Sequence, residues 1–447
     1  MHNKKVSFIS LGCPKSLVDS ERMLGLLVQN GVILCEDYQD SDAIIINTCG
    51  FIESAREESL ETINQALKMK EKGIVKKVFV TGCMVDFCHD ALFKKLKNVD
   101  GFLSVKGRDK IVDFLNVLWD GKRKEKYFRA NNGEPCLYDR ERLRLTPRHF
   151  AYVKISEGCS NPCSFCSIPK IRGAIKSKKE DEIISEIKEL VEDGAREIIL
   201  VAQDTTLYGW DIHKKSVLDE LLIKISNIDK IKWIRLLYAH PAHITREIIN
   251  VIVECKNIVK YIDMPIQHIS DKILFAMNRK VGAKQIRDLI YYMRSVCPDI
   301  AIRTSVIVGF PGETEKDFNE LCNFINEVKF DRLGAFIYSP EAHTPASRFL
   351  DQVEQKVKIE RFEKIIELQE KIAFEKNKSL SGKKIECIID KKTREGEFLY
   401  EGRTYMDAPD VDGVIYFKEP NLQPGDFVEA EVVNYKGYDL VGKVSQF

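Results

Sequence analysis

The chain has 447 residues, a formal net charge of +1 and a hydrophobic content of 44%. This composition is ordinary for a globular protein of two or three domains, and the balanced charge excludes a global field that would gather nucleic acid. No apolar run approaches the length of a membrane span, and no cleavage-like site follows the short apolar run near the amino terminus. We therefore expect a cytoplasmic protein without a membrane partner, whose 13 cysteines form no disulfides.

Residues 1–120 alternate short apolar strands with helical patterns. The predicted strands at residues 6–11, 43–46 and 78–80 are separated by helical patterns at residues 17–28 and 53–70. This alternation predicts an amino-terminal open parallel α/β domain. Cys13, Cys49 and Cys83 each follow one of the three strands. Because the carboxyl ends of parallel strands share one edge, we expect the three thiols to converge there.

Residues 121–145 form a polar connector between the first and the second domain. Nine Lys or Arg stand against four Asp or Glu between residues 121 and 149, which gives a net charge of +5. Such a surplus of charge is typical of a solvated linker, which is our expectation. Contact with RNA or with an acidic surface is the alternative.

Residues 146–376 repeat short β-rich runs and amphipathic helical patterns. Six strands are predicted, at residues 152–155, 197–202, 233–238, 259–264, 301–308 and 333–338. This repeat predicts a parallel partial (β/α) barrel whose active face lies at the carboxyl ends of the strands. Gln203, His240, Gly309 and Glu313 follow strands of the repeat, so we expect them to line one pocket.

Cys159, Cys163 and Cys166 lie in one short loop directly after the first barrel strand. Gaps of three and two residues let a compact loop hold a metal cluster, and Gly158 and Pro162 supply the bends. A 4Fe-4S cluster held only by protein takes four thiolates, so a set of three leaves one iron open for another ligand. The two cysteine trios therefore predict two 4Fe-4S clusters, each with an open iron.

Two alternatives to cluster binding stay open. A lone cysteine is commonly a small buried apolar residue, and this alternative weighs more on the amino-terminal trio than on the loop. Zinc prefers four ligands in two close pairs. The chain lacks a second close pair near either trio, although Cys88 and His89 could complete a zinc site with Cys83.

The last part of the chain, residues 377–447, changes to short alternating strands. They are predicted at residues 384–389, 397–400, 413–417 and 427–435, after a charged helical pattern at residues 355–378. This pattern predicts a small all-β barrel. From Ser381 to Phe447, nine Lys or Arg stand against thirteen Asp or Glu, a net charge of −4. We expect Asp407, Asp410 and Asp412 to help this barrel capture a basic protein.

The loop Cys159-x3-Cys163-x2-Cys166, with Phe165 before the last cysteine, resembles the signature of radical S-adenosylmethionine (SAM) enzymes. Over essentially the whole chain, the three-part layout resembles their methylthiotransferase branch, with an amino-terminal cluster domain, a radical barrel and a TRAM domain. Within this branch, segments 10–21, 151–159 and 402–409 are similar to the enzymes that modify an aspartate of the small-subunit ribosomal protein S-twelve. Ser16 stands where those enzymes usually carry Asn.

The resemblance implies an activity and a set of cofactors. The open iron of the barrel cluster would bind SAM, and the amino-terminal cluster would carry the sulfur that becomes a methylthio group on the β-carbon of the aspartate. Phe165 would pack near the adenine, with Gln203, Gly309 and Glu313 as further cofactor-binding residues. The partners would be protein S-twelve or the small ribosomal subunit, and a reduced electron donor such as flavodoxin or ferredoxin.

Two other functions stay open. A related MiaB-type methylthiotransferase would use the same clusters and barrel to modify an adenosine of transfer RNA. A metal-stabilised RNA-binding protein without catalytic activity is the third possibility. RNA is a polyanion and favours a basic docking module, whereas ribosomal proteins are rich in Lys and Arg. The acidic carboxyl-terminal barrel therefore favours the protein substrate.

Overall fold

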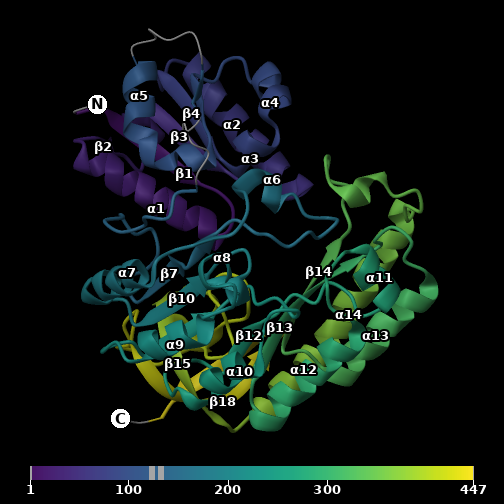
Figure 1. The fold of residues 1–447 in the computed structure, drawn as a ribbon. Helices are drawn as coiled ribbons and strands as arrows, with labels where there is room; N and C mark the ends of the chain where they lie inside the picture. The colour runs from purple at the N-terminus through teal and green to yellow at the C-terminus, as the bar shows by residue number, and fades with distance from the viewer. Residues whose placement is uncertain (1–2, 120–125, 129–134, 446–447) are drawn as a thin grey trace.

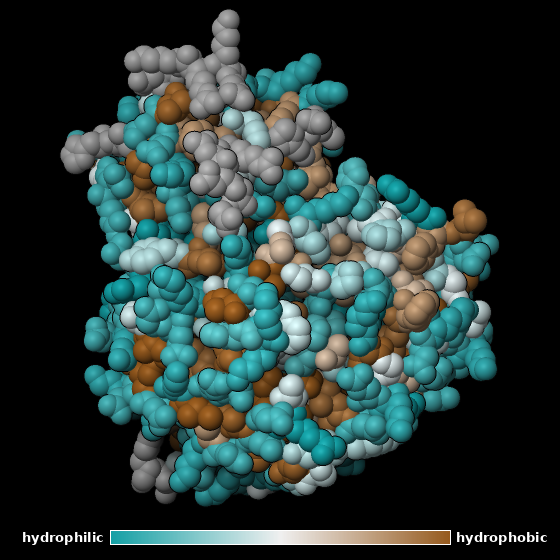
Figure 2. Space-filling view, in the orientation of Figure 1, coloured by the Kyte–Doolittle hydropathy of each residue, from teal (hydrophilic) through white to brown (hydrophobic). Residues whose placement is uncertain are grey.

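The computed structural model describes residues 3–119, 126–128 and 135–445 (Figure 1). The amino-terminal domain lies above the central domain in this view (Figure 1). The yellow strands of the carboxyl-terminal domain lie at the lower left, beside the central domain. On the face seen in Figure 2, apolar residues are scattered among polar ones. No helix in these ranges combines the length and the apolar character that a membrane span requires.

The amino-terminal domain is the predicted parallel α/β sheet. Six parallel strands lie in the order β2-β1-β3-β4-β5-β6. Their bounds are β1 Lys5–Ser10, β2 Ile33–Leu34, β3 Ala43–Thr48, β4 Lys77–Gly82, β5 Gly101–Leu103 and β6 Tyr127–Phe128. The helices are α1 Pro14–Gln29, α2 Glu53–Glu71, α3 Cys83–Phe87, α4 His89–Lys95 and α5 Ile111–Trp119. All of β3 is buried, as expected for a central parallel strand covered on both faces.

The central domain confirms all six predicted strands. They form two parallel three-stranded sheets, β11-β10-β7 and β12-β13-β14, joined by an isolated bridge between Ile234 and Ile258. The strands are β7 Phe150–Lys154, β10 Glu197–Val201, β11 Trp233–Leu236, β12 Tyr261–Asp263, β13 Ala301–Val308 and β14 Arg332–Ile337. The result is an open partial barrel, and one large apolar core lies between these strands and their helices.

The helices of the central domain alternate with its strands. They are α6 Ile168–Arg172, α7 Glu180–Glu192, α8 Trp210–His213, α9 Leu218–Ser226, α10 Arg246–Glu254, α11 Asp271–Ala276, α12 Ala283–Val296, α13 Glu315–Val328 and α14 Gln355–Leu380. A two-residue ladder of β8 (Ser156–Glu157) and β9 (Lys176–Ser177) closes the base of the cysteine loop. Thr314 caps α13 through a reciprocal capping box with Asp317, which fixes the start of this helix directly after the β13 loop.

The carboxyl-terminal domain is the predicted small all-β barrel. Its closed strand order is β15-β16-β17-β19-β18. The strands are β15 Lys384–Lys392, β16 Tyr400–Thr404, β17 Ile415–Phe417, β18 Phe427–Lys436 and β19 Asp439–Val444. The second strand begins where the prediction at residues 397–400 ended, and β19 was not predicted. The last predicted strand, residues 427–435, matches β18, and a two-residue turn, Gly437 and Tyr438, brings the unpredicted β19 back along it.

Two aspartates expected to dock a partner are buried in the protein. Asp407 pairs with Arg332 of β14, with a shortest N···O distance of 2.5 Å, and Asp412 pairs with Arg303 of β13 at 3.2 Å. The docking expectation is therefore wrong for these two residues, because they join the small barrel to the central domain. Of the three, only Asp410 is exposed.

The connector is not a solvated linker in the part that the structure describes. Asp139 is only 1% exposed. Arg142 reaches Glu21 of α1 at 3.4 Å and Glu186 of α7 at 3.3 Å. This segment therefore packs between the first two domains, and Asp139 and Arg142 pair there with buried charges.

A network of buried charges holds the amino-terminal domain on the barrel. Asp19 of α1 contacts Arg108 and Lys154, each at 2.5 Å. Asp139 of the connector contacts Arg108 and Lys178, each at 2.6 Å. Burial opposes ionisation of Asp139, but the charges of Arg108, Lys154 and Lys178 outweigh it and lower the pKa of this carboxyl far below its usual value. The network thus stays ionised although it is buried.

We expect the substitution Asp139→Asn to destabilise the protein strongly. Removing one member of a buried ion network leaves its partners as uncompensated buried charges, which costs about 3–5 kcal/mol. Urea unfolding followed by intrinsic fluorescence measures the change. Glu367→Gln is the matched control, because it breaks a solvent-exposed pair with Lys371. A loss for Asp139→Asn no larger than that of the control would show that the network does not hold the domains.

Candidate active site

The three amino-terminal cysteines converge at one edge of the sheet, as predicted. Cys13 caps the start of α1 after β1, Cys49 follows β3, and Cys83 opens α3 after β4. A Cβ atom added at Gly12 would lie 3.3 Å from the Cβ of Cys49, and one added at Gly50 would lie 2.7 Å from the carbonyl carbon of Cys83. The chain segments that carry the three thiols are therefore packed against one another.

The surroundings of the three thiols shift their pKa values in different directions. Burial raises the pKa of Cys83 to about 12 and also raises the pKa of Cys49. Burial opposes ionisation of Cys13 as well, but the nearby cations Lys15 and Arg172, with hydrogen bonds from Ser16, lower its pKa below the usual value. Because metals bind thiolates, metal binding here has to release protons.

The other trio lies in the loop between β8 and α6. Gly158 enters this loop with φ +76°, and a Cβ there would lie 2.2 Å from the carbonyl oxygen of Ala174, so only glycine fits. The N–H of Asn161 points to Cys159 Sγ at 3.4 Å. Burial raises the pKa of Cys159 to about 11 and that of Cys166 to about 12.

Neighbouring barrel loops hold the cysteine loop in place. The Ser164 N–H donates to Met277 O at 3.0 Å, and the Ser164 carbonyl accepts from Ala346 N at 2.9 Å. Arg279 lies between α11 and α12 and approaches Cys163 Sγ with its Nη1 at 3.6 Å. The thiols of this loop therefore sit in a preformed cradle at the carboxyl ends of the barrel strands.

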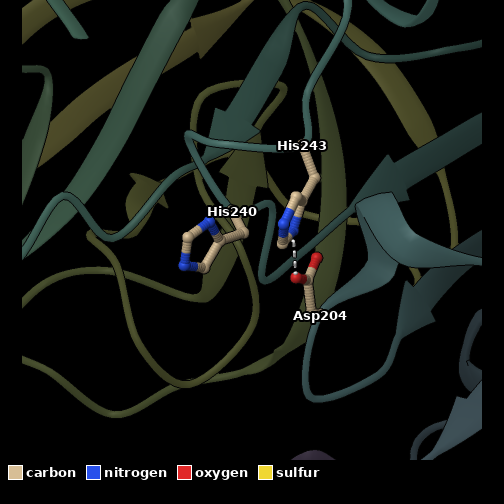
Figure 3. A group of neighbouring side chains, drawn as sticks. All are labelled: Asp204, His240 and His243. Atoms are coloured by element: carbon tan, nitrogen blue, oxygen red, sulfur yellow. Dashed lines mark hydrogen bonds and ion pairs between the residues drawn. The ribbon is translucent and has the colours of Figure 1, made fainter. Parts of the chain in front are cut away.

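Asp204, after β10, is a second brace of the cysteine loop. Figure 3 shows Asp204 beside His240 and His243. Its Oδ2 accepts from Asn161 Nδ2 at 2.7 Å and lies 2.8 Å from His243 Nδ1, while its Oδ1 accepts from Thr206 Oγ1 at 2.5 Å. His240 stacks on His243 with ring centres 4.7 Å apart. Burial lowers the pKa of His240 to about 2, so this ring is neutral.

The thiols of each trio are less closely grouped than the ligand atoms of the one compact set found among the described residues. Two thiolates on one zinc ion lie within about 4.6 Å of each other, twice the Zn–S distance. Among the described residues, only Asp204, His240 and His243 form a group of three His, Cys, Asp or Glu whose ligand atoms all lie within 4.8 Å of one another. Neither cysteine trio is drawn together so tightly, which suits a cluster whose thiolates bind different irons.

The Asp204 group is a hydrogen-bonded brace and not a metal site. Both oxygens of Asp204 already accept hydrogen bonds from the protein, and His240 Nδ1 accepts from Ala242 N at 3.1 Å. The neutral His240 ring therefore carries its proton on Nε2, which is buried and has no partner among the described residues. Too few lone pairs remain free in this group to bind a cation.

A chain of polar contacts joins the two trios. Arg172 of α6 donates to Cys83 Sγ at 3.3 Å and to both oxygens of Glu157 at 2.9 and 3.0 Å. Gln203 Nε2 donates to the same carboxylate at 2.9 Å. Glu157 precedes Gly158 and Cys159, so these contacts connect Cys83 of one trio with the start of the loop that carries the other. Sequence reasoning missed Arg172 because no pattern marks an arginine that reaches a cysteine 89 residues away.

Of the four predicted cofactor-binding residues, Gln203 has an unused hydrogen-bond acceptor and Phe165 lies in apolar surroundings. Gln203 Oε1 is buried and has no hydrogen-bond partner in the described part of the chain, so it fits a donor such as the ammonium group of SAM. Phe165 packs against an apolar cluster formed by Ile273, Met277, Phe310, Tyr338 and Ala346. This environment suits a flat, partly apolar group such as adenine.

The other two residues form an internal brace. Glu313 Oε2 accepts from the N–H groups of Gly309 and Phe310, and its Oε1 accepts from Arg361 at 2.8 Å. Gly309 has φ +71°, and a Cβ there would lie 2.3 Å from Lys358 Cγ. A residue with a side chain would therefore clash at this position. Glu313 thus shapes the loop after β13, and its contact with a cofactor stays a prediction, as does that of Gly309.

Three family matches cover most of the chain. Residues 5–104 match the Uncharacterized protein family UPF0004, residues 153–325 match the Radical SAM superfamily, and residues 382–444 match the TRAM domain. The cysteine loop lies within the second match and the amino-terminal trio within the first.

Solved structures share the fold at low sequence identity. The radical SAM methyltransferase TsrM from Kitasatospora setae, solved with tryptophan and a SAM analogue, has a TM-score of 0.57 at 13% identity, over 77% of this chain and 75% of that one. The cobalamin-dependent radical SAM enzyme OxsB has a TM-score of 0.53 at 13% identity, over 80% of this chain and 56% of that one. These two likenesses concern the fold alone.

Curated relatives are much more similar over their whole length. Three of them are described as ribosomal protein uS12 methylthiotransferase RimO. The one from Caldicellulosiruptor saccharolyticus is 45% identical to this chain, over 98% of this chain and 99% of the relative. The relative in Clostridioides difficile is 43% identical over 98% of both chains. The relative in Geobacter sulfurreducens is 42% identical over 99% of this chain and 98% of its own. The chain therefore belongs to the RimO family of radical SAM methylthiotransferases.

Proposed function

We propose that this protein attaches a methylthio group to the β-carbon of an aspartate in ribosomal protein uS12. The observation that carries the proposal is the pair of cysteine trios on separate domains, linked through Arg172, Glu157 and Gln203. A reaction that removes a hydrogen from one carbon and adds sulfur to it needs two reactive centres beside one substrate. The relatives are named for this activity on uS12.

The barrel trio is the proposed site of a 4Fe-4S cluster that binds SAM. Cys159, Cys163 and Cys166 would supply its three thiolates, and Gln203 and Phe165 would hold the cofactor's ammonium group and adenine. When bound, cluster and SAM supply a reductive cleavage that generates the radical needed to activate an unreactive carbon. Contacts of Arg279 with Cys163 and of Asp204 with Asn161 hold the loop in place, which supports this assignment.

The amino-terminal trio is the proposed site of a second 4Fe-4S cluster, which carries the sulfur. Cys13, Cys49 and Cys83 would hold it, again with one iron open. Arg172 is already bonded to Cys83 and would offset the negative charge of the thiolates. Cys83 and Glu157 are both buried, and exclusion of water strengthens electrostatic interactions at such a site.

The remaining assignments follow from the same proposal. The methylthiotransferase domain would span residues 1–120, the connector residues 121–145, the radical barrel residues 146–376 and the TRAM domain residues 377–447. Gly309 and Glu313 would shape the adenosine side of the barrel. A ribosomal substrate implies a cytoplasmic enzyme, and the reductive step requires a donor such as flavodoxin or ferredoxin.

Mass spectrometry of uS12 from cells with and without this chain tests the proposed function. We expect one aspartate of uS12 to gain the mass of a methylthio group in place of a hydrogen only when the chain is present. An unmodified uS12, together with a methylthio group on a transfer RNA adenosine, would overturn the proposal in favour of the MiaB-type activity.

We expect the barrel trio to control cleavage of SAM. The wild-type protein reconstituted under anaerobic conditions should hold about eight irons, from two 4Fe-4S clusters. Replacing Cys159, Cys163 and Cys166 together by Ala should leave about half of this iron and abolish formation of 5′-deoxyadenosine. Product analysis by chromatography measures the loss. Cleavage that survives this substitution would place the SAM site elsewhere.

The amino-terminal trio should control only the transfer of sulfur. Replacing Cys13, Cys49 and Cys83 by Ala should also halve the iron, while reductive formation of 5′-deoxyadenosine continues without methylthio product. Replacing Cys255, Cys297 and Cys322 by Ala is the matched control, because these thiols belong to neither trio and pack in or against the apolar core of the barrel. Full product formation by the amino-terminal variant would show that these thiols serve only for packing.

A further inference from the structure

An apolar patch on the surface of the central domain is left in water. Phe275, near the end of α11, is 88% exposed, and Leu350, in the loop before α14, is 96% exposed. Phe349 beside it is also exposed. Some of the apolar side chains in Figure 2 lie at its right-hand edge, where Figure 1 shows α11 and the loop before α14. Apolar side chains that are exposed together indicate a surface that a partner covers.

Gly312 joins the two segments that carry this patch. Its N–H donates to Asp351 O at 2.7 Å, and its carbonyl accepts from Lys272 Nζ at 2.7 Å. Asp351 directly follows Leu350, and Lys272 lies about one helical turn before Phe275. The exposed side chains therefore belong to one surface, although they are far apart in the sequence.

The patch is in contact with the cysteine loop of the barrel. Ala276, which follows Phe275, accepts from Ser164 Oγ at 2.7 Å through its carbonyl. Asn278 Nδ2 donates to Pro162 O at 2.9 Å. Ser164 and Pro162 both belong to the cysteine loop. A partner seated on the patch would therefore stand beside the loop that is proposed to hold the SAM-binding cluster.

The amino-terminal domain covers another side of this loop. Ile171 of α6, the helix that follows the loop, packs in one apolar cluster with Cys83 and Val105 of the amino-terminal domain. A second protein cannot approach the loop from α6 unless the domains separate. The α11 side is open, because Phe275 and Leu350 are exposed there.

The surroundings of the patch are positively charged. Residues 271–281 and 342–352 contain four Lys or Arg against two Asp, a net charge of +2. Lys280 and Arg348 are exposed, and neither has an ion-pair partner in the ranges that the structure describes. Free cations around an apolar centre are complementary to a partner whose docking face carries carboxylates.

We propose that Phe275, Lys280, Arg348, Phe349 and Leu350 form the docking patch for a small acidic redox protein that delivers the electron needed to cleave SAM, an inference that rests on the proposed function. In this step one electron leaves the reduced partner and enters the oxidised cluster, and no bond forms or breaks. Electron transfer between proteins slows steeply with distance, so the partner has to dock beside the loop that holds the cluster. Transient electron-transfer complexes also use small interfaces, which suits a patch of this size.

The modified protein, uS12, is the other protein that this enzyme has to bind. Ribosomal proteins are rich in Lys and Arg, so the cations of the docking patch would repel uS12. The substrate also has to reach both cysteine trios, whereas an electron donor has to reach only the barrel trio. Both points favour the electron donor at this surface.

Charge reversal at the docking patch tests the inference. Flavodoxin and ferredoxin, two acidic one-electron carriers, are the probes, and anaerobic calorimetry measures their binding to the reconstituted holoenzyme at several salt concentrations. We expect Lys280→Glu with Arg348→Glu to weaken binding about tenfold and to flatten its salt dependence, because attraction becomes repulsion. Lys188→Glu with Lys232→Glu is the matched control on the same domain, since both lysines are exposed, and it should bind like the wild type.

Removing the apolar centre is an independent arm of the same experiment. Phe275→Ser with Leu350→Ser should also weaken binding about tenfold, but it should leave the salt dependence unchanged because no charge is altered. Ile223→Ser is the matched control, since Ile223 on α9 is 45% exposed and lies outside the docking patch.

Formation of 5′-deoxyadenosine distinguishes a docking defect from damage to the site. Dithionite is a small reductant that needs no docking surface, so both double variants should cleave SAM like the wild type with dithionite and more slowly with the protein donors. Cleavage lost with dithionite as well would assign these residues to the site and overturn the inference.

Three results of the binding measurements would also overturn the inference. They are wild-type affinity for both donors in both double variants, no binding of either donor by the wild type, and weaker binding of uS12 with donor binding unchanged. A wild-type protein that cleaves no SAM even with dithionite, or that leaves uS12 unmodified, would instead refute the proposed function itself.

Discussion

The structure depends on a set of buried, mutually neutralising charges between two domains that each carry half of the candidate active site. Asp19 on α1 and Asp139 on the connector share Arg108, and each also binds a lysine of the barrel. Buried ion pairs contribute little net stability compared with apolar contacts, but they require defined partners at defined distances. Such an interface fixes the position of one cysteine trio relative to the other.

Arg172 extends this network to the site itself. It binds Asp19 and Glu157 of the network and donates to Cys83. The same guanidinium therefore sets the position of the domains and tunes a thiol of the sulfur-side trio. This coupling explains why a five-residue helix, α6, directly follows the cysteine loop: it brings Arg172 back toward the amino-terminal domain within a few residues.

The sequence predicts those parts of the site that depend on local pattern and topology. Strand periodicity and the parallel-sheet rule place Cys13, Cys49 and Cys83 together, and the spacing of the loop marks the other trio. Counting charges along the chain led to a wrong prediction where acidic residues pair with basic residues far away in the sequence. The acidic surplus of the last domain suggested docking by Asp407 and Asp412, yet Arg332 and Arg303 neutralise them from positions more than 70 residues away. A single sequence does not indicate which opposite charges will meet.

The division of labour between the domains explains why the interface has to be rigid. In the proposed function, the barrel would hold the group that activates a carbon, and the amino-terminal domain would hold the sulfur-side trio. Since the same substrate carbon has to meet both centres, a movement between the domains would change the distance to one of them. Paired charges in the interface, such as Asp19 with Lys154, restrict this freedom.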